Sequence, residues 1–290
     1  MHQVDERIRV RSRLSGLQLY IPVVMGLKEQ LRGIIPDPVI CCLSDRFDVI
    51  GTVAVLSLPP TLSAYKLAIA HAILSRRKNI KTVINKTSRL EGCNRTAQVE
   101  ILAGTGTITV HHEYDFAYRL DVGTVFFNPR LGSERKRVTG QVQSGEKLLV
   151  PCCGVGPFVV PAAARGAEIV AVEQNPEACR WLAENLALNG VKDRVTIIHG
   201  DAFDTSPLPV YPFDRAIIPT PYGMDAIFGV IAPRVKRGGM IHFYTFRNHN
   251  QADTLIAEFG RKGFEVVTRR RCGNVAPGVS RWVFDLVKGV

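Results

Sequence analysis

The fold of this chain is decided by the stretch Lys147-Leu148-Leu149-Val150-Pro151-Cys152-Cys153-Gly154-Val155-Gly156-Pro157-Phe158. A short apolar run leads into a tight Gly-x-Gly turn, and a proline opens the segment that follows. This pattern is typical of a buried strand entering a helix, because proline near the first helical position loses no needed N–H. Glycines at such a turn let a ligand approach the backbone closely. The stretch therefore predicts a strand–turn–helix unit, either a plain structural turn or a ligand-binding loop.

Two acidic residues favour the ligand-binding interpretation. Ile169-Val170-Ala171-Val172 is a second apolar strand, and Glu173 follows it about 20 residues after the turn. In Rossmann-like units, an acidic residue at this place holds the ribose hydroxyls of a nucleotide. Asp201 follows a third strand in the same way. The sequence thus predicts binding of a nucleotide or of S-adenosylmethionine.

Strands and helices alternate throughout the second half of the chain. Strands are expected at residues 147–151, 168–172, 194–198, 214–218, 239–245, 264–270 and 281–287, and the clearest helix at 178–189. Alternation of this kind implies a mostly parallel sheet with helices on both faces. The last two strands follow each other without a helix, which predicts an antiparallel hairpin at one edge. Such an ending is typical of class I S-adenosylmethionine-dependent methyltransferases rather than of dehydrogenases.

Three segments are expected along the chain. A helical segment over residues 1–40, with a basic arm at 1–13 and a helix over 17–35, ends at Pro36 and Pro38. A small α+β domain should span residues 41–138, with one long strand at 49–56. A Rossmann-like α/β domain should fill residues 139–290.

The formal net charge of +11 over 290 residues predicts a polyanionic partner, most economically a nucleic acid. A basic surface kept only for solubility is the alternative. Seven cysteines without a C-x-x-C motif argue against a zinc site and fit reduced thiols in a cytosol. With no signal peptide and no 18-residue apolar run, we expect a soluble cytoplasmic protein that does not bind membranes.

Several ordered blocks resemble one family, the archaeal and eukaryotic tRNA (guanine-37-N1)-methyltransferases. The resemblance covers about residues 42–290. Its blocks are Phe47-Asp48-Val49-Ile50-Gly51, Gly92-Cys93-Asn94-Arg95, Glu100-Ile101-Leu102-Ala103-Gly104, Thr107-Ile108-Thr109-Val110-His111, Asn128-Pro129-Arg130-Leu131-Gly132-Ser133-Glu134-Arg135, Gly154-Val155-Gly156-Pro157-Phe158, Glu173-Gln174-Asn175-Pro176, Gly200-Asp201-Ala202 and Ala276-Pro277-Gly278.

The resemblance implies S-adenosylmethionine as cofactor, the anticodon stem-loop of a tRNA as partner, and a monomer. It assigns two catalytic residues: Glu134 as the general base at guanine N1, and Arg95 as the cation that neutralises charge growing on O6. The methyl donor would contact Cys153, Gly154, Val155, Gly156, Pro157, Phe158, Glu173, Gln174, Asn175, Asp201, Ala202 and Pro219. The substrate would contact Arg130, Arg135, Pro221 and Tyr222.

This assignment makes chemical sense. Guanine N1 is a poor nucleophile while it carries its proton, so a positioned carboxylate that removes it speeds transfer, typically by about 10²–10⁴. A guanidinium beside O6 would act like an oxyanion hole. The target base must leave its stack to reach the donor. The alternative for Glu134 is a solvated ion pair on a helix, since Arg130, Arg135 and Arg137 surround it in sequence.

Two departures from the family pattern keep other functions open. Val150 stands where the family has an acidic residue, and Pro219-Thr220-Pro221 replaces its Asn-Leu-Pro. The alternatives are the related wybutosine-pathway aminocarboxypropyl transferase, a methyltransferase with another substrate, and an RNA-binding relative without activity. The retained Arg130, Leu131, Glu134 and Arg135 favour methyl transfer.

Overall fold

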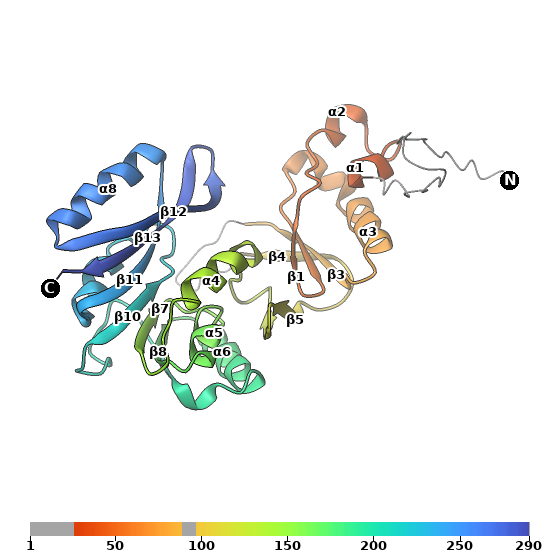
Figure 1. Cartoon of the computed structure of the whole chain (residues 1–290). Coiled ribbons are helices and arrows are strands. Elements are labelled where there is room, and N and C mark those ends of the chain that lie inside the picture. Colours follow the sequence, from red (N-terminus) through yellow and green to blue (C-terminus); the bar gives the residue numbers. More distant parts are fainter. Residues whose placement is uncertain (1–25, 89–96, 290) are drawn as a thin grey trace, which may run out of the picture.

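The computed structural model describes residues 26–88 and 97–289, in which two sheets stand apart along the chain (Figure 1). The first 25 residues, the segment 89–96 and Val290 are outside the described residues. Arg95, the basic arm and the first part of the helix expected over 17–35 therefore lie outside them as well.

The larger sheet has seven strands in the order β12-β13-β11-β10-β7-β8-β9. Their bounds are β7 (Lys147–Pro151), β8 (Glu168–Glu173), β9 (Val195–His199), β10 (Phe213–Ile218), β11 (Val235–Arg247), β12 (Phe264–Ala276) and β13 (Val279–Lys288). β7 to β11 run parallel, and β13 is antiparallel to both of its neighbours. The predicted parallel sheet with an antiparallel hairpin at its edge is confirmed.

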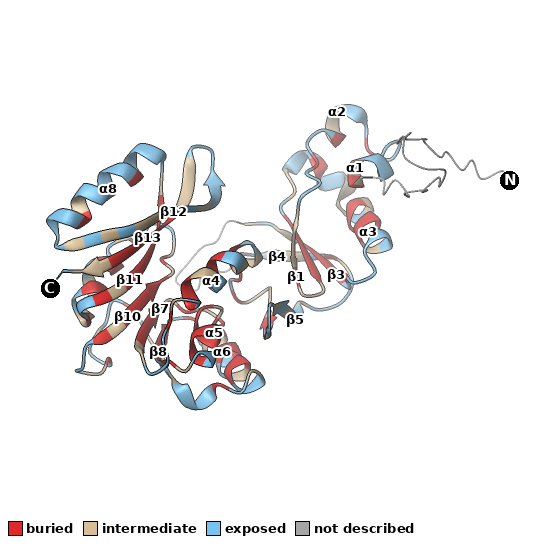
Figure 2. Cartoon of the chain, in the orientation of Figure 1, coloured by how far each residue is buried: buried red, intermediate tan, exposed pale blue. Residues whose placement is uncertain are grey.

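Each face of this sheet is covered by helices (Figures 1 and 2). Leu148 and Val150 point into one apolar cluster with α5 and α6, whereas Leu149 points into another with α7 and α8. The helices are α4 (Gly132–Thr139), α5 (Val159–Ala164), α6 (Pro176–Leu188), α7 (Ile227–Ile231) and α8 (His249–Arg261), with 3₁₀ turns η2 (Pro129–Leu131), η3 (Lys192–Arg194) and η4 (Ala232–Arg234). Burial on both faces explains why the central strands are apolar throughout.

Two local predictions need correction. α5 begins at Val159, so Pro157 lies in the loop before the helix rather than at its first residue. α6 begins at Pro176, two residues earlier than expected, because the Asn175 side chain caps it by accepting from the Glu177 N–H at 3.0 Å.

The smaller sheet has four strands in the order β1-β2-β3-β4. Its elements are α1 (Leu27–Gln30), α2 (Asp37–Ile40), β1 (Asp48–Ile50), β2 (Val53–Leu56), η1 (Pro60–Tyr65), α3 (Lys66–Arg76), β3 (Thr82–Lys86) and β4 (Val99–Ala103). The single strand predicted over 49–56 is a hairpin instead. Gly51 makes the turn with φ +55°, and a side chain there would meet the Val110 carbonyl oxygen at 2.4 Å.

The short hairpin of β5 (Ile108–Glu113) and β6 (Phe116–Asp121) joins the two parts. Asn185 of α6 and Asn189, which follows this helix, bond its backbone, with Asn185 accepting from the Arg119 N–H at 2.7 Å. Near the N-terminal end of the described residues, Leu27 and Ile40 are buried in the same apolar cluster as side chains of the smaller sheet. We therefore propose a division near residue 105, in place of those expected after residues 40 and 138.

Among the described helices, none is long and apolar enough to span a membrane.

Candidate active site

One pocket opens at the carboxyl edge of the parallel strands. The loops after β7, β8, β9 and β10 bring Gly154, Glu173, Asp201 and Pro219 to its wall. We call it the donor pocket. Its lining is Phe126, Cys152, Gly154, Val172, Glu173, Gln174, Asn175, Ala178, Gly200, Asp201, Ala202, Pro219, Thr220, Pro221, Met224, Phe246 and Arg281. Ligands of open α/β sheets bind at this edge, outside the carboxyl ends of the strands.

The two turn glycines have different tasks. Gly156 has φ +92°, and a side chain there would come within 2.5 Å of Leu182 on α6, so it lets the loop pack against that helix. Gly154 has φ +57°, and the space above it is open, with only the Phe126 carbonyl oxygen 3.9 Å from an added Cβ. Gly154 thus offers bare backbone to a ligand, which a side chain would displace.

Glu173 is fixed at the end of β8 by backbone donors. Its Oε2 accepts from the Gly154 N–H at 2.8 Å, and its Oε1 from the Asn175 N–H at 2.9 Å. Each carboxylate oxygen has more than one lone pair, so hydroxyl groups of a ligand can still donate to it. The carboxylate ties together two loops of the pocket.

The remaining predicted donor residues divide into two groups. Cys153, Pro157 and Phe158 line a smaller pocket beside Gly154. Val155 is buried behind the loop, where its carbonyl oxygen accepts from Asn185 at 3.0 Å, and it lines none of the described pockets.

Of the two departures, Pro219 lies in the donor pocket, and Val150 is fully buried in the cluster against α5 and α6.

A second, basic depression adjoins the donor pocket, and we call it the substrate groove. Its lining is Asp48, Lys86, Phe126, Phe127, Asn128, Arg130, Leu131, Ser133, Glu134, Arg270, Arg271, Cys272, Gly273, Asn274, Val275 and Arg281. Phe126 and Arg281 line both the groove and the donor pocket, so the two sites meet at these side chains.

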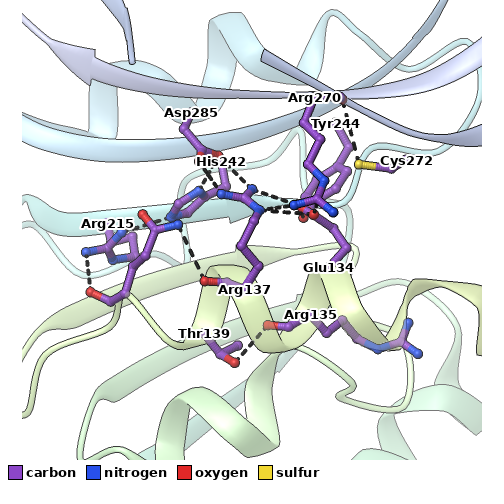
Figure 3. Close-up of polar contacts among 11 residues, drawn as sticks. Glu134, Arg135, Arg137, Thr139, Arg215, His242, Tyr244, Arg270, Cys272 and Asp285 are labelled. Atoms are coloured by element: carbon purple, nitrogen blue, oxygen red, sulfur yellow. Dashed lines mark hydrogen bonds and ion pairs between the residues drawn. The ribbon is translucent and has the colours of Figure 1, made fainter. Parts of the chain in front are cut away.

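Glu134 lies in this groove on the first turn of α4 and is only 4% exposed. Its Oε1 accepts from Arg137 Nη2 at 2.6 Å and from the Tyr244 hydroxyl at 3.0 Å. Its Oε2 is 3.0 Å from Arg137 Nε and 3.8 Å from Arg270 Nε (Figure 3). The helix-face ion pair considered as the alternative exists, between Glu134 and Arg137 of α4, but it is buried rather than solvated.

The Glu134–Arg137 ion pair is part of a polar network that extends into the interior (Figure 3). Arg137 also donates to Asp285 at 2.5 Å, and His242 Nδ1 is 2.7 Å from Asp285. Burial opposes the charge of Arg137, but hydrogen bonds to Glu134 and Asp285 raise its pKa. Burial would likewise raise the pKa of Asp285, but bonds from His242 and Arg137 outweigh it and hold that pKa well below the usual range.

The four predicted substrate residues differ in placement, and Pro221 lines the donor pocket rather than the groove. Arg130 reaches the groove and donates to Asp48 at 2.6 Å. Arg135 is only 2% exposed and is held by Glu113 and by the Asn128 carbonyl oxygen, although one edge lines the smaller pocket. Tyr222 is 61% exposed and stacks near Phe246, a lining residue of the donor pocket.

Sequence reasoning missed Lys86, Tyr244, Arg270 and Arg281. Burial lowers the pKa of Lys86, although Asp48 partly offsets this. The signal that could have found Arg270 is the run Arg269-Arg270-Arg271 in a strand. Nothing local marks Tyr244, since it reads as a core residue of β11.

A seven-stranded sheet that ends in this antiparallel hairpin, with an acidic residue at the end of β8, is the fold of class I S-adenosylmethionine-dependent methyltransferases. Residues 109–273 match the TRM5/TYW2 methyltransferase domain, and residues 27–107 match the TYW2 N-terminal domain. The chain belongs to the TRM5/TYW2 methyltransferase family.

Individual relatives agree with this. The tRNA (guanine(37)-N(1))-methyltransferase Trm5b of Pyrococcus abyssi is 32% identical over 88% of this chain and 76% of its own length, and its crystal structure superposes with a TM-score of 0.79. A complex of aTrm5 and tRNALeu gives a TM-score of 0.82 at 25% identity, covering 97% of this chain and 82% of that one. TYW2 of P. horikoshii in complex with MeSAdo gives 0.73 at 27% identity, covering 91% and 98%.

Proposed function

We propose that this enzyme transfers the methyl group of S-adenosylmethionine to N1 of guanine 37 in tRNA. The observation that carries the proposal is the placement of Glu134, a buried carboxylate in a basic groove that shares Phe126 and Arg281 with the donor pocket. A guanine bound in the groove and a methyl donor bound in the pocket would meet at these two side chains.

The donor supplies a methyl group on a positively charged sulfur. Glu134 would accept the N1 proton while N1 bonds to the methyl carbon; the carbon–sulfur bond would break, its electron pair would go to sulfur, and neutral S-adenosylhomocysteine would leave. Glu173 and the open backbone at Gly154 hold the donor on the other side of the junction. By the family resemblance, Arg95 would face O6 and stabilise the charge that develops there.

The groove suits an RNA backbone. Its lining includes Arg130, Lys86, Arg270 and Arg271, the last two from β12. Cations of this kind bind phosphates and release counterions. With the net charge of +11, they support the anticodon stem-loop as the bound part of the tRNA. A monomer in the cytoplasm remains part of the proposal.

The test is product analysis. Purified protein is incubated with an unmodified tRNA transcript and methyl-labelled S-adenosylmethionine, and the product is digested to nucleosides and identified by mass spectrometry. We expect 1-methylguanosine at position 37 and no product from a transcript with adenine there. Label at another position or nucleoside would contradict the proposal.

Aminocarboxypropyl transfer is the second candidate, because residues 27–107 match the TYW2 N-terminal domain. The same pocket could present another carbon of the donor's sulfonium to the base. A carboxyl-labelled donor separates the two reactions: methyl transfer leaves that label in the small-molecule product, and aminocarboxypropyl transfer moves it onto the tRNA.

A further inference from the structure

Glu134 has two unequal carboxylate oxygens. Oε1 accepts three contacts, from Arg137 Nη2 at 2.6 Å, Arg137 Nε at 3.1 Å and the Tyr244 hydroxyl at 3.0 Å. Oε2 has one close donor among the described residues, Arg137 Nε at 3.0 Å. Arg270, which lines the substrate groove, is 3.8 Å from Oε2. Oε2 is thus the oxygen that faces the groove with accepting capacity left.

Arg137, one of the two residues that donate to Oε1, is itself held by a series of buried hydrogen bonds (Figure 3). Arg137 is fixed by Asp285, and Asp285 by His242. Arg215 Nη1 lies 2.8 Å from His242 Nε2, and because arginine can only donate, that nitrogen must accept. His242 therefore carries its proton on Nδ1 and donates it to Asp285. Burial lowers the pKa of His242 despite the bond to Asp285, which agrees with a neutral ring.

The donors fix the geometry of this network: Arg215 donates to Glu146 and His242, and His242 donates to Asp285. Arg137 donates to both Asp285 and Glu134. Glu146 accepts from Arg215 at 2.9 Å, so charged groups lie on both sides of the neutral His242 between Glu146 and Glu134, across β10, β11, β13 and α4. Buried ionic networks of this kind hold one geometry because breaking any member leaves a charge unpaired.

Building on the proposed function, we propose that Oε2 of Glu134 is the atom that takes the guanine N1 proton, and that Tyr244 and the Arg137–Asp285–His242 chain are positioning residues that fix this choice. Tyr244 holds Oε1 of Glu134 away from the guanine. Asp285 shares the charge of Arg137, so that this guanidinium does not fully neutralise Glu134.

The groups facing Glu134 come from every packed element: Arg137 from α4, Tyr244 from β11, Arg270 and Cys272 from β12, and Asp285 through Arg137 from β13. Burial and, to a smaller extent, the nearby charge of Glu134 raise the pKa of Cys272 to about 12. Burial also raises the pKa of Tyr244 well above its usual value. Both stay protonated over the working range. Neither Cys272 nor Tyr244 therefore contributes to the acid limb of the pH profile.

Tyr244→Phe removes one donor to the charged carboxylate and leaves the ring in place. The single-turnover rate should fall roughly tenfold at unchanged tRNA affinity. The acid limb of its pH profile should move up by roughly half a unit to one unit, because a lost bond to the charged form raises the proton affinity. Tyr118→Phe is the control, since Tyr118 is also fully buried and its hydroxyl has no partner among the described residues.

Asp285→Asn should shift the acid limb of the pH profile in the opposite direction from Tyr244→Phe. With Asp285 neutral, the whole charge of Arg137 falls on Glu134, which becomes a weaker base, so the limb moves to lower pH and the maximal rate falls. Asp193→Asn is the control, because Asp193 is exposed on η3 before β9.

The outcomes separate this inference from the proposed function. A wild-type protein that makes no 1-methylguanosine overturns the proposed function. A wild type that makes it, together with variants that fold by thermal melting but keep the wild-type pH profile, overturns the positioning role alone. Shifts of both variants in one direction also overturn it, since simple loosening of the site would cause that. Should Asp285→Asn not fold, Tyr244→Phe decides by itself.

Discussion

The donor pocket and the substrate groove adjoin each other, yet they are built in different ways. The pocket uses loop backbone and one carboxylate, Glu173, placed by the shared carboxyl edge of parallel strands. The groove uses long charged side chains from α4, β12, β13 and the smaller sheet, and its Glu134 is held by a buried network of ion pairs and hydrogen bonds. Backbone sites tolerate changes in side chains nearby, whereas a side-chain network depends on every member.

The largest expected effect lies in the groove. Glu134→Gln should slow single-turnover methyl transfer at least about tenfold, because the amide cannot accept the N1 proton. Affinity for tRNA should change little, which quench-flow and filter-binding measurements can separate. Asp253→Asn, on exposed α8, is the control. An unchanged rate would remove Glu134 from the chemistry.

A substitution in the donor pocket should lower the affinity for the methyl donor instead. Glu173→Ala removes the ribose acceptor and the tie between two loops, so donor affinity should fall roughly ten- to a hundredfold by calorimetry. Glu177→Ala is the control, an exposed acid nearby that pairs with Arg180. Wild-type donor affinity in Glu173→Ala would show that the carboxylate is not the ribose partner.

The rim of the groove should affect RNA binding alone. Arg270→Ala with Arg271→Ala should weaken tRNA binding about tenfold and reduce the salt slope by roughly one per lost phosphate contact. Donor affinity should stay the same. Arg261→Ala, exposed on α8, is the control. If donor and tRNA affinity fell together, the two regions would not be independent.

The smallest effect concerns stability against acid. His242 has a lowered pKa in the fold, so unfolding binds a proton as pH falls below about 6.5, and stability decreases there by at most roughly 1.4 kcal/mol per pH unit per proton. Asp285 also has a lowered pKa and adds a loss below about 4. Urea unfolding at pH 7 and 5.5 should show a smaller difference in His242→Gln than in wild type. His249→Gln, exposed on α8, should behave as wild type.

The same contrast explains what the sequence could predict. Gly154, Glu173, Asp201 and Pro219 each follow a parallel strand, and such strand ends meet at one edge whatever the register. The groove depends on β13 inserting between β11 and β12, and on a register that places Asp285 opposite His242. Arg137 and Asp285 are 148 residues apart. Neither propensity nor periodicity encodes that meeting, so only the family resemblance indicated Glu134.

Arg135 shows the limit of the resemblance itself. Its place beside Glu134 implied a substrate contact, yet its guanidinium is held by Glu113 of the β5–β6 hairpin. A pairing partner 22 residues away cannot be read from a motif. Gly51 is a similar case on the scale of a strand, where one residue at positive φ turns an expected strand into a hairpin.

The most direct measurement is a crystal structure of the protein with S-adenosylhomocysteine and an anticodon stem-loop. We predict that guanine 37 lies flipped into the substrate groove with N1 about 3 Å from Oε2 of Glu134. Oε1 should remain bonded to Tyr244 and Arg137. A base whose N1 faces another acceptor, or faces Oε1, would contradict both the division between the two regions and the role given to Glu134.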